Sequence, residues 1–427
     1  MNISWLKPII PNYMGLLRNI RTFESLALRD YRYLWLGQLS TSMGQWMDQV
    51  ARAWLVYDIT HSPLQLGLVS AARGLPLLLF GTVAGVFADR YSRKAQLVIA
   101  QVINALLNIV LAALIMTGKV QLWHIYVTGF LSGTVQAFQQ PARQVLISDL
   151  VGEKHLLNAV ALNSAALNLS RSVGPAIGGL LIHAVGVDFS YYTQAGLYVL
   201  ATLWTFQMGV PKATESFGYS GISQSFFGSI KEGFDYIASH RIILALIVLG
   251  LAPIALGMPF ISLMPVFAID VFHGDARTQG MLLTMVGIGA VLGALIIASL
   301  RRGQGNGKLL VIGAAGFGIS LALFAQSPVL LMAVGFTLLA GFFNSSYTSQ
   351  SQTIIQTLVP PQLRGRVLGV YLLNRGLMPV GSLLAGAPAS FMGGPWAVTA
   401  MGLSCFLLAV IITAFVPDLW KLNPLNK

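Results

Sequence analysis

The sequence predicts an all-α membrane protein with twelve transmembrane helices arranged in two six-helix pseudo-symmetric domains. Three observations lead to this fold class: the composition is strongly apolar, apolar runs of helix length recur twelve times, and the two halves of the chain resemble each other. The 427 residues are 55% hydrophobic and only 9% charged, whereas a soluble domain carries about 25% charged residues. We therefore expect a polytopic membrane protein and no enzymatic activity.

The expected spans are apolar runs of about 20 residues, the length that crosses a bilayer as a helix. They lie at 33–57, 65–88, 95–117, 121–141, 157–185, 189–209, 241–269, 278–300, 308–326, 328–351, 367–391 and 395–416. The remaining segments are an amphipathic N-terminal segment (1–32), a linker with an amphipathic helix (210–240) and a tail (417–427). The two domains are then 33–209 and 241–416, which are nearly equal in length.

The distribution of basic residues predicts the orientation. Of the 26 Lys and Arg residues, twenty, including Arg143, fall on the side of both termini, and four fall within spans. Only Lys119 and Arg277 fall in the opposite loops. Because basic residues are retained in the cytoplasm, we expect both termini to be cytoplasmic, in a multi-pass protein of a prokaryotic inner membrane. The net charge of +12 is thus explained by topology, and we expect no nucleic-acid partner.

The two halves align at a constant offset of 208 residues. At this offset Gly81 aligns with Gly289, Gly133 with Gly341, and Gly178 with Gly386. Such self-similarity indicates an internal duplication. Parallel repeats of this kind place a substrate site near the bilayer midplane, between the halves.

The loop between the second and third spans carries a motif of glycines and charges: Gly81, Gly85, Asp89, Arg90, Arg93 and Lys94. Glycines four apart allow helix backbones to approach closely, and the charges can exchange ion pairs as two bodies rock. The spacing resembles the loop motif of the major facilitator superfamily, with Ser92 where that family most often has glycine. The resemblance implies the major facilitator fold and a gating loop in which Asp89 lies at the start of the eleventh helix, where the helix dipole favours a carboxylate. The alternative is a loop that only sets topology.

The fifth span contains Gly174, Pro175, Gly178 and Gly179. Proline removes a backbone hydrogen bond and glycines thin the helix, so we expect a kink at a packing face. The run resembles the end of the antiporter motif of superfamily exporters, although Ser170 replaces an earlier glycine. Stretches at 138–143 and 363–367 resemble the drug and siderophore exporter subfamily that includes the enterobactin exporter. This resemblance implies export.

Polar residues inside the spans supply the candidate sites. A charge at the bilayer centre costs about 2.5–3.5 kcal/mol on insertion scales, so such residues need a function or a partner. The proton-coupling candidates are Asp48, Arg52 and Arg73. The substrate-cavity candidates are Gln45, Asn168, Arg171, Asn344, Tyr347, Asn374 and Arg375. Structural pairing between helices is the alternative, and the excess of arginine suits a cavity that meets anionic groups.

The depths of Asp48 and Arg73 predict that they meet. With a rise of about 1.5 Å per residue, Asp48 lies about 4.5 Å and Arg73 about 5 Å outward of the midplane. Arg52 lies one turn from Asp48 on the same helix face. A neighbouring arginine favours the ionised carboxylate, whereas a low dielectric favours the protonated form. These opposing effects suit a group that loads and releases a proton.

The sequence therefore predicts a secondary active transporter that exports small amphipathic organic molecules, drugs or siderophores, by proton-coupled alternating access. The alternatives are an importer or facilitator of the same fold, or a non-transporting membrane receptor or partner. The expected partners are a small-molecule substrate, protons and the lipid bilayer, with a monomeric protein. The single cysteine, Cys405, and six scattered histidines give no reason to expect a metal or a cofactor.

Overall fold

The computed structural model describes residues 21–209, 226–299 and 306–422, and in these ranges it contains helices and no strands. The first half contains η1 (Arg21–Ala27), α2 (Arg29–Thr60), α3 (Pro63–Arg90), α4 (Arg93–Met116), α5 (Leu122–Val185) and α6 (Val187–Gln207). The second half contains α7 (Phe226–Ser239), α8 (Arg241–Leu251), η2 (Ala252–Gly257), η3 (Met258–Leu263), α9 (Met264–Val266), η4 (Phe267–Val271), α10 (Ala276–Ser299), α11 (Gly307–Ala325), α12 (Leu330–Leu358), α13 (Pro361–Leu373), η5 (Asn374–Leu377), α14 (Met378–Met392), α15 (Gly394–Phe415) and α16 (Pro417–Lys421).

Each of the twelve predicted spans is helical, apart from residues at the span ends, so the predicted fold class is confirmed. The fourth and fifth spans form one continuous element, α5, which turns at Gly152, where φ is +63°. The seventh span runs from α8 to η4 with π and 3₁₀ turns. Its three prolines, Pro253, Pro259 and Pro265, each lack a backbone N–H and disturb the regular helix. Among the described helices, seven are long and apolar enough to cross a bilayer on those criteria alone.

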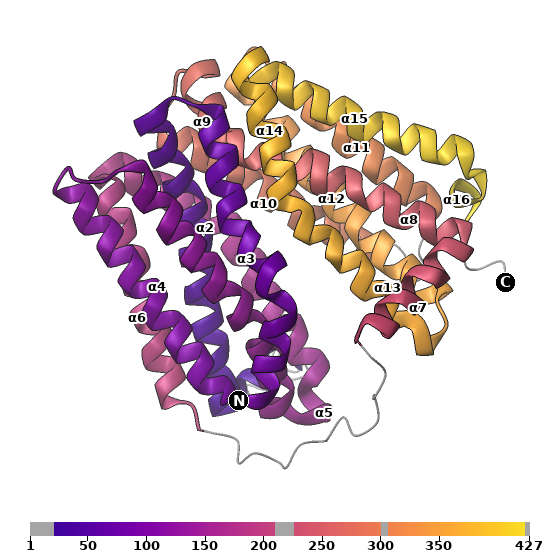
Figure 1. Cartoon of the computed structure of the whole chain (residues 1–427), viewed down its shortest axis with the longest axis horizontal. Helices are drawn as coiled ribbons and strands as arrows, with labels where there is room; N and C mark the ends of the chain where they lie inside the picture. The colour runs from indigo at the N-terminus through magenta and orange to yellow at the C-terminus, as the bar shows by residue number, and fades with distance from the viewer. Residues whose placement is uncertain (1–20, 210–225, 300–305, 423–427) are drawn as a thin grey trace, which may run out of the picture.

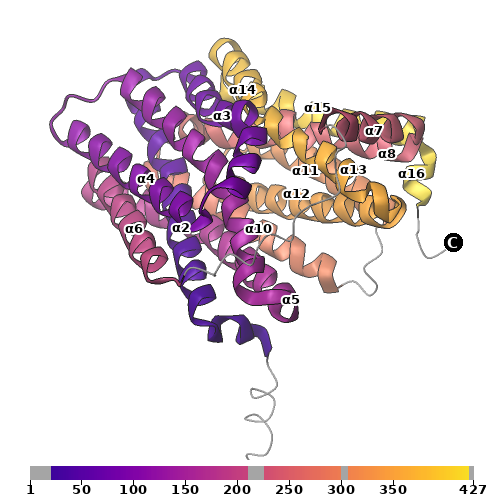
Figure 2. The same cartoon turned by 60° about the horizontal axis from the view of Figure 1, so that its bottom comes forward.

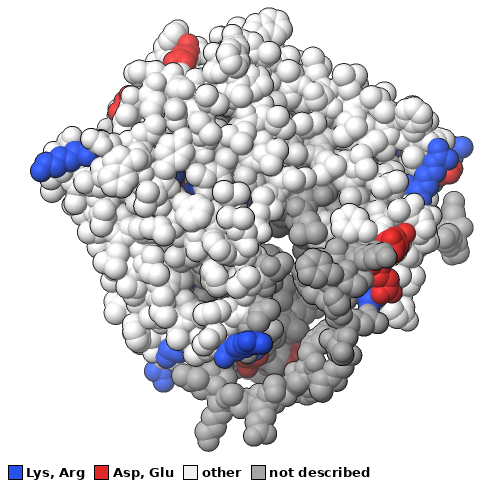
Figure 3. Space-filling view, in the orientation of Figure 1, with Lys and Arg blue, Asp and Glu red and all other residues white. Residues whose placement is uncertain are grey.

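The helices form two bundles that diverge from a common end (Figure 1). The first bundle contains α2 to α6 and the second contains α8 to α15, as the rotated view also shows (Figure 2). We call the end that carries η1, α7 and α16 the terminal face, and the opposite end, with Lys119, Val185 and Asp275, the far face. Charged side chains lie mainly at the margins of the space-filling view and leave a broad uncharged band (Figure 3), as a bilayer requires.

The two bundles are closed together at the far face, where pairs of glycines let their helices approach closely. A Cβ atom at Gly67 of α3 would lie 3.2 Å from the Cα of Gly386 of α14, and one at Gly179 of α5 would lie 3.1 Å from the Cα of Gly280 of α10. Real Cβ atoms rarely approach so closely, so the backbones meet because these positions have no side chain. The largest buried apolar cluster also joins the halves here and includes Leu66.

The terminal face is open in this structure. A Cβ atom at Gly81 or Gly85 of α3 would meet no other atom within 4 Å. The close helix approach expected at these two glycines is therefore not seen in this conformation, whereas it occurs nearer the far face at Gly67. Towards the terminal face the buried apolar clusters of the two halves are separate.

Candidate functional site

The buried centre of the first half contains a carboxylate held by two arginines. Arg73 Nη1 donates to Asp48 Oδ2 at 2.8 Å. Arg52 Nη2 donates to Asp48 Oδ1 at 2.9 Å, and Arg52 Nε donates to Oδ2 at 3.2 Å. The side chains of Asp48 and Arg52 are each 7% exposed, and that of Arg73 is 16% exposed. The predicted juxtaposition of these three residues is confirmed; their role in proton coupling stays a prediction.

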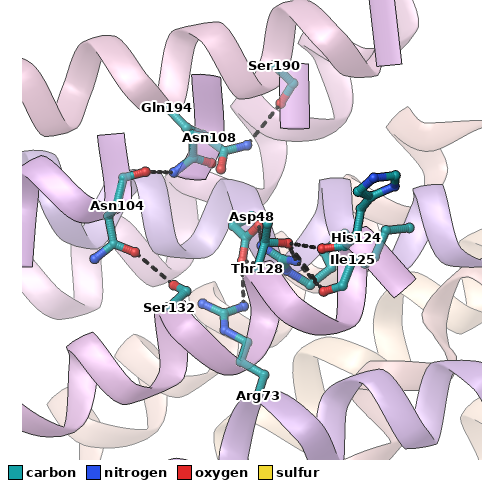
Figure 4. A network of polar contacts seen from close by, with 11 residues as sticks. Asp48, Arg73, Asn104, Asn108, His124, Ile125, Thr128, Ser132, Ser190 and Gln194 are labelled. Atoms are coloured by element: carbon teal, nitrogen blue, oxygen red, sulfur yellow. Dashed lines mark hydrogen bonds and ion pairs between the residues drawn. The ribbon is translucent and has the colours of Figure 1, made fainter. Parts of the chain in front are cut away.

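Polar groups of other helices complete the surroundings of this cluster. Arg52 Nη1 donates to the Ile125 carbonyl and to Thr128 Oγ1, both at 3.0 Å. Tyr191 and Tyr198 of α6 are buried and interact electrostatically with Asp48. Figure 4 shows Arg73 extending from α3 to Asp48, with Thr128 and Ile125 beside Asp48. The cluster thus ties α2, α3 and α5 together in the interior of the first half.

A second polar network lies beside this cluster on α4, α5 and α6. Ser132 Oγ donates to Asn104 Oδ1 at 2.8 Å, Asn108 Nδ2 donates to the Asn104 carbonyl at 2.7 Å, and Gln194 Nε2 donates to Ser190 Oγ at 3.4 Å (Figure 4). Asn104, Asn108, Ser190 and Gln194 are buried. The first half therefore has a polar interior. Buried polar groups are costly unless they are paired or hydrated, and the hydrogen bonds of this network offset that cost.

Four of the predicted cavity residues remain at least partly exposed. Gln45, Arg171 and Asn344 are half-buried, and Asn168 is exposed. The Arg171 guanidinium lies 5.7 Å from the centre of the Trp46 ring, a distance suited to a cation–π interaction. These residues come from α2, α5 and α12, so both halves contribute to the candidate cavity.

The remaining cavity candidates are placed differently. Tyr347 is 1% exposed and belongs to the apolar core of the second half, where its backbone and Cβ atom lie against Gly313 of α11. In this conformation it packs within one half, and its place in the cavity stays a prediction. The side chains of Asn374 and Arg375 lie outside the described part of the structure.

The gating-loop residues make contacts within the first half. Arg93 Nη1 donates to Asp149 Oδ2 at 2.6 Å, and Lys94 Nζ donates to the Phe206 carbonyl at 2.9 Å. Arg90 is exposed, and the side chain of Asp89 lies outside the described part of the structure. The terminal face is open in this conformation, so the contact expected between this loop and the eleventh helix stays a prediction. At the start of that helix, Arg366 pairs with Glu232 of α7.

The glycines of the fifth span serve two different interfaces. A Cβ atom at Gly174 would lie 2.6 Å from Trp46 Cβ, and one at Gly178 would lie 3.2 Å from Met47 Cα, so both pack against α2. Gly179 instead meets α10 across the halves. The expected packing face is confirmed, but Pro175 stays within regular helix. In α5 the residue with non-helical backbone angles is Gly152, not Pro175.

Two polar contacts join the halves at the far face, and sequence reasoning did not find either. Tyr57 of α2 donates to Asp270 of η4. His183 Nδ1 of α5 lies 2.8 Å from Asp275 Oδ2, which also accepts from Arg277 Nε at 3.0 Å. Partial burial raises the pKa of Asp275, but hydrogen bonds from Arg277 and Thr278 outweigh it, so this pKa lies below its ordinary value.

One cation expected on the terminal side of the spans is buried in a helix. Arg143, counted with the residues on the terminal side of the spans, lies inside α5 and is 5% exposed. One of its Nη atoms donates to Gln38 Oε1 of α2. The expected fourth span ends at residue 141, whereas α5 continues as helix to Gly152.

The family follows from the match over nearly the whole chain. Residues 20–425 match the family model described as transmembrane secretion effector. The chain belongs to this family of the major facilitator superfamily. Its relatives in the family are transporters, and the chain is a transporter of that fold, not an enzyme.

Relatives that resemble the chain are named as a transporter, an efflux pump and an exporter. The chain is 26% identical to the staphyloferrin A transporter of Staphylococcus aureus over 89% of this chain and 94% of that protein. It is 27% identical to the multidrug efflux pump Tap of Mycolicibacterium fortuitum, over 91% and 96%. It is 24% identical to the enterobactin exporter EntS of Shigella flexneri, over 84% and 85%.

Solved structures of the superfamily share the fold at lower identity. The nucleoside transporter NupG superimposes with a TM-score of 0.73 and 15% identity, over 92% of this chain and 99% of that chain. A bacterial homologue of the human lysosomal transporter Spinster, in its inward-facing and unoccupied conformation, gives 0.71 and 15%, over 92% and 97%. These likenesses establish the fold of this family member.

Proposed function

We propose that this protein exports small amphipathic organic molecules, of the drug or siderophore kind, by alternating access coupled to proton entry. The observation that carries the proposal is the asymmetry between the two faces. The halves meet at Gly67 with Gly386 and at Gly179 with Gly280, and they are apart at Gly81 and Gly85. Rocking about the far-face contacts would close one end and open the other, as alternating access requires.

The orientation makes the open face the loading side. Basic residues concentrate on the terminal face, which we therefore place in the cytoplasm of a prokaryotic cell, with both termini on that side. We propose that 33–209 and 241–416 move as two bodies joined by the linker 210–240. A molecule then enters from the cytoplasm, meets Gln45, Asn168, Arg171 and Asn344, and leaves at the far face.

The coupling group we propose is Asp48. Both of its oxygens are engaged by arginines, so the ionised form is stabilised while the far face is closed. A proton bound from the far side after rocking would release Arg73, the more exposed of the two arginines. The gating loop, with Gly85, Asp89, Arg90, Arg93 and Lys94, would hold the terminal face closed in that second state.

Uptake into everted membrane vesicles tests the proposal. Vesicles with an acidified interior should accumulate ethidium, rhodamine 6G or carboxyfluorescein when they contain the protein, and nigericin should abolish the accumulation. Equilibration of a dye without a gradient would instead indicate a facilitator. Accumulation only in right-side-out vesicles would indicate an importer. No protein-dependent movement in either orientation would contradict transport of these molecules.

A further inference from the structure

Arg143 and Gln139 form a pair of buried donors that the mechanism above does not use. They are 5% and 4% exposed and lie four residues apart on α5, so they share one helix face. Arg143 Nη2 and Gln139 Nε2 are both buried without a hydrogen-bond partner. Among the described residues, no Asp or Glu pairs with Arg143, whose side-chain contact is the one with Gln38. One donor of each residue, on the same helix face, is thus left without an acceptor among the described residues.

The fold itself does not need a charge at this position. Gly133 of α5 approaches the carbonyl of Arg73 on α3, and Gly341 of α12 approaches the carbonyl of Val286 on α10. The two glycines lie 208 residues apart and each meets a carbonyl of the corresponding neighbouring helix, although the partners Arg73 and Val286 lie 213 residues apart, so α5 and α12 occupy similar places in the two halves.

At that offset the counterparts of Gln139 and Arg143 are Tyr347 and Ser351, and both are buried. The second half fills the same place with hydroxyl groups. A buried cation is costly when the described residues give it no carboxylate partner, and packing does not require one here, so Arg143 points to a function.

The electrostatic setting also favours an anion. Tyr198 interacts with Arg143 and with Asp48, so the two groups belong to one region of the first half. This region contains one carboxylate, Asp48, and three arginines, Arg52, Arg73 and Arg143, which leaves a net charge of +2. An anion at Arg143 would reduce this excess of positive charge, and it would accept charge-assisted hydrogen bonds from the two free donors.

The donor pair borders the open side of the molecule. Gln140 and Gln144, next to Gln139 and Arg143 in the sequence, are exposed. Arg143 follows the first residue of α5, Leu122, by about 31 Å of helix at about 1.5 Å per residue, roughly the thickness of a bilayer, so the donor pair lies near the terminal face.

We infer that Arg143 and Gln139 form an anion-binding subsite, which receives a carboxylate or similarly charged group of the transported molecule. The inference deepens the proposed function, on which it rests, by making the preferred substrates anionic amphipathic molecules. Gln38 positions the guanidinium through its Oε1 atom. The inference predicts discrimination between dyes of similar skeleton and opposite charge.

Direct binding to the purified full-length protein tests the subsite independently of transport. Fluorescence anisotropy of carboxyfluorescein, an anion, is compared with that of rhodamine 6G, a cation of related skeleton. Arg143→Gln should raise the Kd for carboxyfluorescein at least about tenfold, equivalent to about 1.4 kcal/mol, and should leave the Kd for rhodamine 6G unchanged. Arg143→Lys should recover part of the loss. Arg32→Gln removes an exposed arginine of α2 and is the matched control.

A second measurement covers the case in which Arg143→Gln does not fold. Carboxyfluorescein should raise the melting temperature of the wild type, and Gln139→Leu should reduce this increase while keeping the charge. Equal carboxyfluorescein binding in wild type and Arg143→Gln, or no binding by the wild type, overturns the subsite even if vesicle transport is found. Stabilisation by chloride or phosphate alone overturns its assignment to the substrate. Binding without transport would instead contradict the proposed function.

Discussion

Arg73 of α3 donates to Asp48 of α2 at 2.8 Å and so joins two neighbouring helices inside the first half. Arg52 holds the same carboxylate from its own helix at 2.9 Å. Removing one partner of such a buried set is strongly destabilising, by about 3–5 kcal/mol, because the remaining charge is left uncompensated. Stability and coupling therefore have to be separated in any test of Asp48.

We expect Asp48→Asn to abolish gradient-driven accumulation while substrate binding is largely kept, because asparagine cannot carry the proton. The variant should also lose abundance, since Arg52 and Arg73 then face no carboxylate. Dye accumulation in acidified everted vesicles, normalised to protein amount, measures the first effect, and fluorescence-detected size exclusion measures the second.

The double variant Asp48→Asn/Arg73→Gln is the control for stability. It removes one positive charge with the negative one, so abundance should rise above that of the single variant while coupled accumulation stays absent. Coupled accumulation by either variant would show that Asp48 is not the proton carrier, and the search would move to Asp58 or Asp270.

Two glycines of α5 should respond differently to the same substitution. Gly179→Leu places a side chain against Gly280 across the halves, so the far face should fail to close while each half still folds. We expect at least a tenfold loss of transport at near wild-type abundance. Spin labels at Met116 and Phe391, exposed on opposite halves, should show a longer distance.

Gly174→Leu is the matched comparison for Gly179→Leu. Its side chain would meet Trp46 inside the first half, so abundance should fall together with transport. If both substitutions lowered abundance to the same degree, the separate role of Gly179 at the interface between the halves would be wrong.

The far-face contact of Asp275 should depend on pH. Its pKa is lowered in the folded protein by hydrogen bonds from Arg277 and Thr278, so the carboxylate stabilises the start of α10, on which its contact with His183 depends, fully above the ordinary aspartate pKa of about 3.9. The contribution is lost as the pH falls through the lowered value. Because the pair with His183 is partly exposed, we expect an effect of at most about 1 kcal/mol.

Spin-label distances across the far face, measured between pH 7 and pH 3, check this expectation. The wild-type distance should stay constant down to about pH 4 and lengthen below it, as the Asp275 carboxylate is neutralised. Asp275→Asn should lose the contribution of this residue at every pH. An identical acid response in the variant would assign the change to another group.

The gating loop gives a prediction about rate. Asp89→Asn, or Ala at both Arg93 and Lys94, should insert normally and slow the exchange between conformations. Arg93 and Asp149 are both partly exposed, and such surface pairs contribute about 0–1 kcal/mol to stability. Transport rates per molecule are compared with those of Arg32→Ala, an exposed arginine outside the loop. A normal rate at normal abundance would contradict the latch.

The sequence by itself determined the helices, the duplication and the local geometry within a helix. In a bilayer every backbone polar group must be satisfied within the protein, so long apolar runs have helix as their available form. Asp48 and Arg52 are four residues apart, so helical periodicity alone brings them together. The meeting of Asp48 with Arg73 was predictable as well, because helix rise converts sequence position into depth.

The tertiary structure alone decided where the helices end and at which residues the two halves touch. Arg143 lies just beyond the expected end of the fourth span at residue 141, and its burial depends on how far α5 extends beside α2. Tyr57 meets Asp270, and His183 meets Asp275, only because the halves are closed at the far face. That closure depends on how two separately folded bodies dock, which helical periodicity within either body does not encode.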